Sequence, residues 1–251
     1  MKYFLTAVWG LVCLGVLAYG HIHWNQQVAV KAVEPVTTQQ ITETDFSSYL
    51  EMAANWPDTA KDQLKLALES GQPFKILFVG SSSMEWEKSV TQSISESFGS
   101  DKIVTALHTY DQTSADFIGE NKQLELVAEK AQLVVLEPFL FNDNGKLKIE
   151  ETLANVTKMI EDIRAQNPDT TFILQPSNPI YLPQYYSEQI EGLKNFAAAN
   201  NLTYLDHWIA WPATDNPELE NYLNEDQSPN ELGYQAWAHF LSAYFVKNKE
   251  D

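Results

Sequence analysis

A run of three serines follows a short apolar stretch of the chain, and these residue types could support nucleophilic chemistry. Residues 74–80 read FKILFVG and lead directly into Ser81, Ser82 and Ser83. A continuous apolar run of this length that ends in glycine is typical of a buried strand. A serine at such a strand-to-helix turn is either an N-cap, which accepts backbone N–H groups, or a nucleophile whose oxyanion product the helix end stabilises. The turn has no lysine and no GxxxxGK[ST] pattern, so a phosphate-binding loop is not expected.

Two more polar segments follow later predicted strands. Residues 136–145 (LEPFLFNDNG) place Glu137, Asn142 and Asp143 in one loop after the third strand. Taken alone, Asn-Asp-Asn-Gly is a turn signal. Residues 225–233 (EDQSPNELG) precede the last predicted helix, and their Pro-Asn pair is by itself a helix-start signal. Ligands of parallel sheets bind at the carboxyl ends of the strands, so we expect these segments at one edge of the fold together with the serine run.

Taken in chain order, the three segments resemble the conserved blocks of the SGNH hydrolases, also called the GDSL esterase and lipase superfamily. The resemblance covers about residues 74–245 and implies ester hydrolysis by a serine nucleophile on a flavodoxin-like fold. The family's nucleophile corresponds to Ser82, with Ser81 where an aspartate usually stands, and its oxyanion-binding asparagine corresponds to Asn142. The family also takes a backbone N–H donor from a glycine after the second strand, and here Gln112 or a neighbour would have to supply it.

The last block departs from the family pattern, which is Asp-x-x-His followed by Pro-Asn and Gly. Alignment on Pro229 puts Ser228 in the place of the histidine and Glu225 in the place of the aspartate. The histidine is the general base of the family, and a serine hydroxyl cannot accept a proton near neutral pH. Removing a triad base costs several powers of ten in rate. Either the protein is weakly active or inactive, or a different group supplies the base.

His207 is one candidate for the missing base, because it ends the predicted fifth strand at the edge where ligands bind. The ordinary pKa of histidine suits general-base catalysis, and Asp206 and Trp208 could orient and bury the ring. The alternative is that His207 packs or hydrogen-bonds beneath the Pro-Asn loop. A carboxylate such as Glu225 or Asp226 is the other candidate for the base.

Aromatic residues crowd the loops after the fourth and fifth predicted strands. Trp208 and Trp211 are candidates for substrate binding, since aromatic faces stack on sugar rings; otherwise they cover the edge of the sheet. No His-x-x-His pair and no cysteine cluster occurs in the sequence, so neither a metal site nor a cofactor is expected.

The segments that must position these residues alternate between strands and helices. Strands are expected at residues 74–80, 102–110, 131–139, 171–176 and 202–208. Helices are expected at residues 47–70 with an interruption at Pro57, from the serine run to about residue 98, and at 115–130, 149–166, 185–200 and 231–247. This alternation predicts right-handed βαβ units, and therefore a three-layer α/β/α sandwich around a five-stranded parallel sheet.

The amino-terminal segment has a different composition. An uncharged run of 18 residues, from Tyr3 to Gly20, follows Lys2 and contains the single cysteine, Cys13. A run of this length can just span a bilayer, and Lys2 predicts that the amino terminus stays inside. A cleaved signal peptide is the alternative, because Ala18 and Gly20 offer small residues at a plausible cleavage spacing. The single cysteine excludes an intramolecular disulfide.

These features predict three parts. Residues 1–24 form a membrane anchor or signal peptide, residues 25–44 a linker rich in Gln and Thr, and residues 45–251 the SGNH hydrolase-like domain. The domain is therefore expected outside the cytoplasm, held at the cell membrane by one N-terminal pass, or secreted if the segment is cleaved.

The amino-acid composition limits the classes of molecule that the protein is expected to bind. Hydrophobic residues make up 44% of the 251 residues, which is typical of a globular chain, and the net charge is −18. A strongly acidic chain is a poor ligand for nucleic acid and favours neutral or cationic substrates over polyanions. The sequence thus predicts an extracytoplasmic serine esterase that acts on an acylated small molecule or a cell-envelope glycan. An inactive relative that binds glycans or assembles the envelope, and an O-acyltransferase, are the alternatives.

Overall fold

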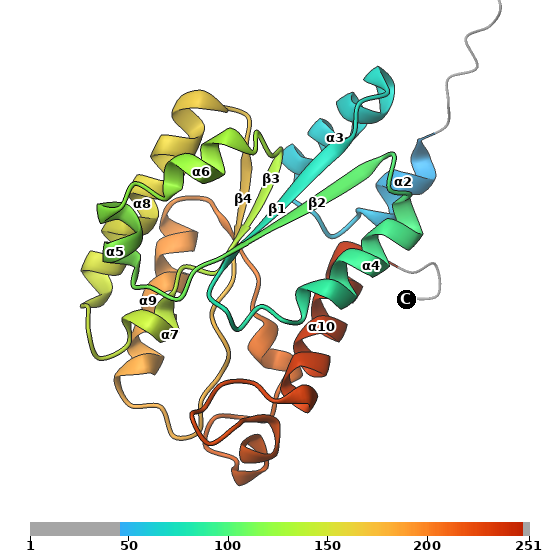
Figure 1. Cartoon of the computed structure of the whole chain (residues 1–251). Coiled ribbons are helices and arrows are strands. Elements are labelled where there is room, and N and C mark those ends of the chain that lie inside the picture. The colour runs from blue at the N-terminus through green and yellow to red at the C-terminus, as the bar shows by residue number, and fades with distance from the viewer. Residues whose placement is uncertain (1–45, 248–251) are drawn as a thin grey trace, which may run out of the picture. The chain divides into compact units, whose positions relative to one another are not determined.

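The computed structural model describes residues 46–247, and their centre is one parallel sheet (Figure 1). Its five strands lie in the order β2-β1-β3-β4-β5. The strands are β1 (Phe74–Gly80), β2 (Ile103–Thr109), β3 (Leu133–Leu136), β4 (Thr171–Leu174) and β5 (Thr203–Tyr204). All four strand pairs are parallel. This is the strand order of flavodoxin-like folds. The chain adds strands on one side of β1 and then on the other, so the switch point lies between β1 and β3, where such sheets bind their ligands.

Helices cover both faces of the sheet (Figure 1). One face carries α2 (Ser47–Met52), α3 (Asp58–Ser70), α4 (Glu87–Phe98) and α10 (Glu231–Phe245). The other carries α5 (Ser114–Gly119), α6 (Gln123–Ala128), α7 (Leu140–Asp143), α8 (Ile149–Gln166) and α9 (Tyr185–Ala199). Two 3-10 helices, η1 (His207–Ala210) and η2 (Pro217–Tyr222), lie in the long connection after β5. The predicted α/β/α sandwich is therefore confirmed.

Alternating side chains of β1 fill the two halves of the core. Phe74, Ile76 and Phe78 pack on the α3, α4 and α10 side, whereas Leu77 and Val79 pack on the α8 and α9 side. Successive residues of a strand point to opposite faces, so a strand covered on both sides reads as a continuous apolar run. This burial fixes the carboxyl end of β1, from which the serine run projects.

Several elements are shorter than the periodicity predicts. The fifth strand has only two residues, and His207 belongs to η1 rather than to a strand end. The helix expected at 115–130 is broken into α5 and α6 where Asn121 adopts a left-handed conformation, with φ of 56°. The interruption expected at Pro57 is present, because Pro57 is the N-cap of α3. The short helices α7, η1 and η2 were not predicted, since none is long enough to show a hydrophobic period.

Within residues 46–247, no helix is both long enough and apolar enough to cross a membrane. The predicted anchor or signal peptide at residues 1–24 and the linker at 25–44 lie outside the described residues.

Candidate active site

The serine run forms a turn at the carboxyl end of β1. Ser81 is buried, whereas Ser82 is exposed and its hydroxyl makes no hydrogen bond to any residue that the structure describes. The hydroxyl groups of Ser81 and Ser83 share a hydrogen bond of 2.6 Å. Helix α4 begins only at Glu87, with Trp86 as its N-cap residue, so none of the serines caps it. The N-cap interpretation of this turn is therefore wrong, and the nucleophile interpretation stays a prediction.

A buried carboxylate lies directly beneath this turn. Glu137, the first residue after β3, is fully buried, and its Oε2 accepts the backbone N–H of Ser81 at 2.7 Å. Its Oε1 accepts the hydroxyl of Ser177 from the loop after β4. Burial raises the pKa of Glu137, and these hydrogen bonds oppose the rise. The sequence placed Glu137 in the loop after the third strand without a role, and a lone carboxylate at the end of its most apolar strand was the available signal.

Asn142 lies on α7, next to the loop that follows β2. Its Nδ2 donates to the backbone carbonyls of Gln112 at 3.1 Å and of Tyr110 at 3.5 Å. The neighbouring Asp143 is buried and accepts the backbone N–H of Ser114 at 2.8 Å, and also the hydroxyl of Thr152 at 2.7 Å. These bonds join α7 to the start of α5 and to α8. Asn142 and Gln112, both predicted oxyanion-binding positions, are therefore adjacent in the structure.

The side-chain amide of Gln112 is an unused donor. Its Nε2 is buried and has no hydrogen-bond partner among the described residues. The loops after β1 and β2 also meet, because the N–H of Tyr110 donates to the carbonyl of Gly80 at 2.9 Å. The loops after β1, β2 and β3 thus converge at the carboxyl edge of the sheet, as predicted.

Ser228, which the alignment on Pro229 places at the position of the family histidine, is part of a closed turn. Its hydroxyl donates to Oδ1 of Asp226 at 2.6 Å, and its backbone N–H donates to the same oxygen at 3.0 Å. These two bonds lower the pKa of the Asp226 carboxyl. Glu225 is exposed. The amide of Asn178 anchors the turn by donating to the carbonyl of Gln227 at 2.9 Å.

His207 is fully buried, and both of its ring nitrogens have partners. Nε2 is 2.9 Å from the carbonyl oxygen of Pro176, and Nδ1 accepts the indole N–H of Trp211 at 3.1 Å. The ring stacks on Trp237 with centroids 4.0 Å apart. Burial lowers the pKa of His207 to about 3. This is the packed and hydrogen-bonded alternative, and neither ring nitrogen bonds to the serine run.

A groove of about 640 Å³ connects the segment after the serine run with the 224–231 turn. It is lined by Glu85, Trp86 and Ser89 on one side and by the turn and the start of α10, including Tyr234, on the other. Burial and the charges of Glu85 and Asp226 raise the pKa of Tyr234 to about 12. The groove is therefore acidic, and its lining starts at Glu85, shortly after the serine run.

Solved structures with the same architecture include esterases. No protein-family profile and no curated protein sequence matches the chain. Among solved structures, a peptidoglycan O-acetylesterase matches with a TM-score of 0.63 at 11% identity, over 76% of this chain and 96% of its own. The chain has the SGNH hydrolase fold.

Two further structures with this fold match over most of their length. A GDSL-like lipase from Bacteroides thetaiotaomicron has a TM-score of 0.52 at 16% identity, over 75% of this chain and 98% of its own. A catalytic mutant of an acetylxylan esterase from Geobacillus stearothermophilus has a TM-score of 0.54 at 14% identity, over 70% and 95%. The SGNH fold thus spans nearly the whole length of each of these proteins.

The two tryptophans that were predicted to bind substrate are tied into the SGNH scaffold. Trp211 is buried, and its indole N–H is used by His207. Trp208 is partly exposed, and its indole N–H donates to the carbonyl of Ser177 at 2.8 Å. Trp208 also lines a second hollow, of about 400 Å³, which contains the Lys194–Asp206 ion pair. Of the two, only Trp208 presents a face to solvent.

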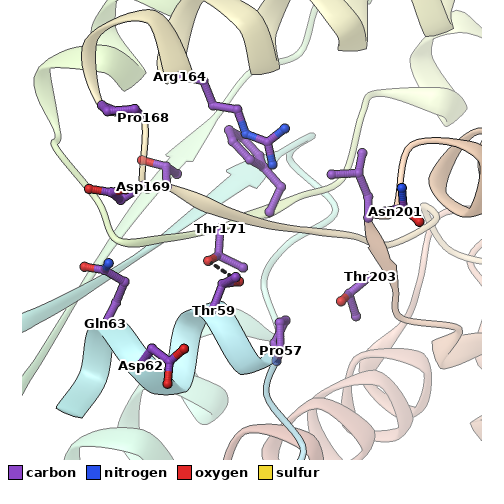
Figure 2. A pocket seen from close by; sticks show the side chains of 13 residues that line it. Pro57, Thr59, Asp62, Gln63, Arg164, Pro168, Asp169, Thr171, Asn201 and Thr203 are labelled. Atoms are coloured by element: carbon purple, nitrogen blue, oxygen red, sulfur yellow. Dashed lines mark hydrogen bonds between the residues drawn. The ribbon is translucent and has the colours of Figure 1, made fainter. Parts of the chain in front are cut away.

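A third hollow, of about 370 Å³, lies at the amino ends of β4 and β5, opposite the carboxyl ends of the strands in the SGNH sheet (Figure 2). Its lining includes Thr171 and Thr203, the first residues of β4 and β5, together with Thr59 and Arg164. The guanidinium of Arg164 lies over the ring of Phe172 at 5.1 Å. None of the residues predicted from the sequence to act in catalysis or binding lines this hollow.

Proposed function

We propose that the protein is a serine esterase of the SGNH type. Ser82 attacks the carbonyl carbon of an acyl ester, and the resulting oxyanion is held by the amide of Asn142 and by N–H groups of the Gln112 loop. The alcohol leaves, and water then releases the acyl group from Ser82. The observation that carries the proposal is the exposed, unbonded Ser82 hydroxyl at the carboxyl edge of a fold shared with known esterases.

The proposed base is an exposed carboxylate rather than an imidazole. Both ring nitrogens of His207 are already used, and its pKa of about 3 leaves it a weak base. The bonds from Ser228 lower the pKa of Asp226 and use its Oδ1, and Glu225 is the other exposed carboxylate that the sequence offers. A carboxylate is less basic than a histidine near neutral pH, so we expect slow turnover.

The proposed substrates are short acyl esters of neutral or cationic alcohols, including O-acetyl groups on a cell-envelope glycan. The acidic groove supports this, because Glu85 and Glu231 line it and no lysine or arginine does. Structures with the same fold include esterases of peptidoglycan and of xylan acetyl groups. The uncharged run before Gly20 supports a position outside the cytoplasm, held at the membrane. A reporter fused after Asp251 that is active only in the cytoplasm would contradict that position.

The proposal is tested by turnover of an activated acetyl ester by the full-length protein and by its Ser82→Ala variant. We expect slow hydrolysis that is lost in Ser82→Ala. Comparing acetate esters of neutral, cationic and anionic alcohols tests the groove: Glu85→Gln should weaken discrimination against the anionic ester, whereas Glu96→Gln, an exposed glutamate on α4 outside the groove, should not. Equal rates in Ser82→Ala and in the unmodified protein would contradict the esterase assignment.

A second candidate is an inactive relative that binds acylated glycans in the groove. The Asp226–Ser228 turn supports it, because Ser228 is bonded to Asp226 and the sequence pattern predicts that this segment corresponds to the family's Asp-x-x-His without an imidazole. Under this alternative, an O-acetylated glycan fragment binds the full-length protein and is recovered with its acetyl groups intact. If the protein is an esterase, we expect the acetyl groups to be released.

A further inference from the structure

Glu137 is a buried acidic side chain that has no cationic partner among the described residues. The residue is fully buried, and no lysine, arginine or histidine within residues 46–247 pairs with it. Burying a carboxylate without an opposite charge is costly, and hydrogen bonds must offset that cost. We therefore expect the carboxyl group of Glu137 to position the backbone segments that hydrogen-bond to it.

The hydrogen bonds to Glu137 come from two loops of the candidate site. One oxygen accepts the N–H of Ser81, at the turn after β1, and the other accepts the hydroxyl of Ser177, after β4. The backbone N–H of Glu137 donates to the carbonyl of Val79 at 2.8 Å, so the backbone of Glu137 is hydrogen-bonded to β1. The carboxylate therefore joins the ends of three neighbouring strands at the switch point of the sheet.

Gly80 makes this close approach possible. A Cβ atom at Gly80 would lie 2.8 Å from Cβ of Glu137 and 2.9 Å from its Oε2. Contacts under about 3.0 Å require atoms to move. The turn is thus packed directly on the carboxylate. The Ser81 hydroxyl in turn shares a hydrogen bond of 2.6 Å with the hydroxyl of Ser83, which links the two serines that flank Ser82.

We propose that Glu137 is the positioning residue of the nucleophile turn: by accepting the backbone N–H of Ser81, it fixes the direction in which Ser82 presents its hydroxyl. The role of Glu137 in catalysis rests on the proposed esterase function. Its hydrogen bond to the Ser81 backbone N–H is independent of that function. Glu137 touches neither substrate nor reacting atoms. It acts through Ser81, and its carboxylate supplies an acceptor that an apolar side chain of similar size lacks.

The test compares Glu137→Leu, which removes the acceptor, with Glu137→Gln, which keeps an amide oxygen for the Ser81 N–H. Thr170→Val is the matched control. Thr170 is also buried, and the substitution removes one hydrogen bond, of 2.9 Å, from its hydroxyl to the carbonyl of Ala131. Thr170 lies before β4, at the end of the sheet away from the serine run. The readouts are kcat and KM on an acetyl ester, and hydrogen exchange of the Ser81 amide, all in the full-length protein.

We expect Glu137→Leu to lower kcat at least tenfold with KM within about twofold, and to speed exchange of the Ser81 amide at least tenfold. Glu137→Gln should restore both to within about threefold, and Thr170→Val should change neither. Unchanged exchange of the Ser81 amide in Glu137→Leu overturns the proposal. If the unmodified protein hydrolyses no ester, the esterase assignment fails, and the exchange measurement still decides whether Glu137 holds the turn.

Discussion

The indole N–H of Trp211 donates to Nδ1 of His207 across 3.1 Å. The proton of the neutral ring is therefore on Nε2, where the carbonyl oxygen of Pro176 accepts it at 2.9 Å. Protonation of Nδ1 would place two donors against each other and would put a charge in the core. These contacts make His207 a neutral component of the scaffold around η1.

This arrangement predicts loss of stability in acid. The pKa of His207 is about 6.5 when exposed and about 3 in the fold, so the unfolded state takes up the proton first. The contribution of His207 is present above about pH 6.5 and is lost as the pH falls towards 3, by up to about 1.4 kcal/mol per pH unit. Urea unfolding between pH 7 and pH 4 should show a shallower decline in His207→Gln. Replacing the exposed His239 by Gln is the control, and identical slopes in all three proteins would refute the assignment.

Restoring an imidazole at position 228 should raise activity. Ser228 lines the groove beside Trp86 and Glu85, at the place that the family histidine occupies in the sequence pattern. General-base catalysis typically contributes about 100- to 10,000-fold, so we expect Ser228→His to raise kcat/KM for an acetyl ester at least tenfold. Ser228→Ala, which also breaks the bond to Asp226, should show no such gain. A folded Ser228→His variant with no gain would mean that this turn does not face Ser82.

Removing the amide of Asn142 should slow the chemical step. The loss of one oxyanion donor costs about 100- to 1,000-fold in kcat, with little effect on ground-state binding. Asn142→Ala should therefore lower kcat by that factor and leave KM nearly unchanged. Asn167→Ala provides a matched control, because Asn167 also donates its amide to a backbone carbonyl at 3.1 Å but lies after α8, away from the site. Equal losses in the two variants would assign Asn142 a scaffold role only.

A methyl group at Gly80 should disturb the turn. The added Cβ would lie 2.4 Å from Sδ of Met84 and 2.8 Å from Cβ of Glu137. Met84 can move, whereas the buried Glu137 has less freedom, so we expect Gly80→Ala to cost about 1–3 kcal/mol of unfolding free energy. Gly119→Ala is the control, since nothing lies within 4 Å of its added Cβ. Chemical denaturation measures both, and a Gly80→Ala protein as stable as the control would show that the packing on Glu137 is loose.

The sequence predicted the layers and most of the elements, because long apolar periods report burial directly. The bounds of β1 and α8 were predicted correctly, whereas β5 was predicted as 202–208 and has two residues. The surroundings of His207 lay beyond prediction, since its partners Pro176 and Trp237 are distant in the chain. The contact between Glu137 and Ser81 was equally hidden, because it depends on the register of β1 against β3.

Covalent labelling shows directly whether Ser82 is the nucleophile. The full-length protein is treated with a fluorophosphonate, which reacts with activated serines, and the modified peptide is sequenced by mass spectrometry. If Ser82 is the nucleophile, we expect one adduct, on Ser82, with slower labelling in Glu137→Leu and none in Ser82→Ala. An adduct on Ser81 or Ser83, or no adduct on a folded protein, would contradict that role.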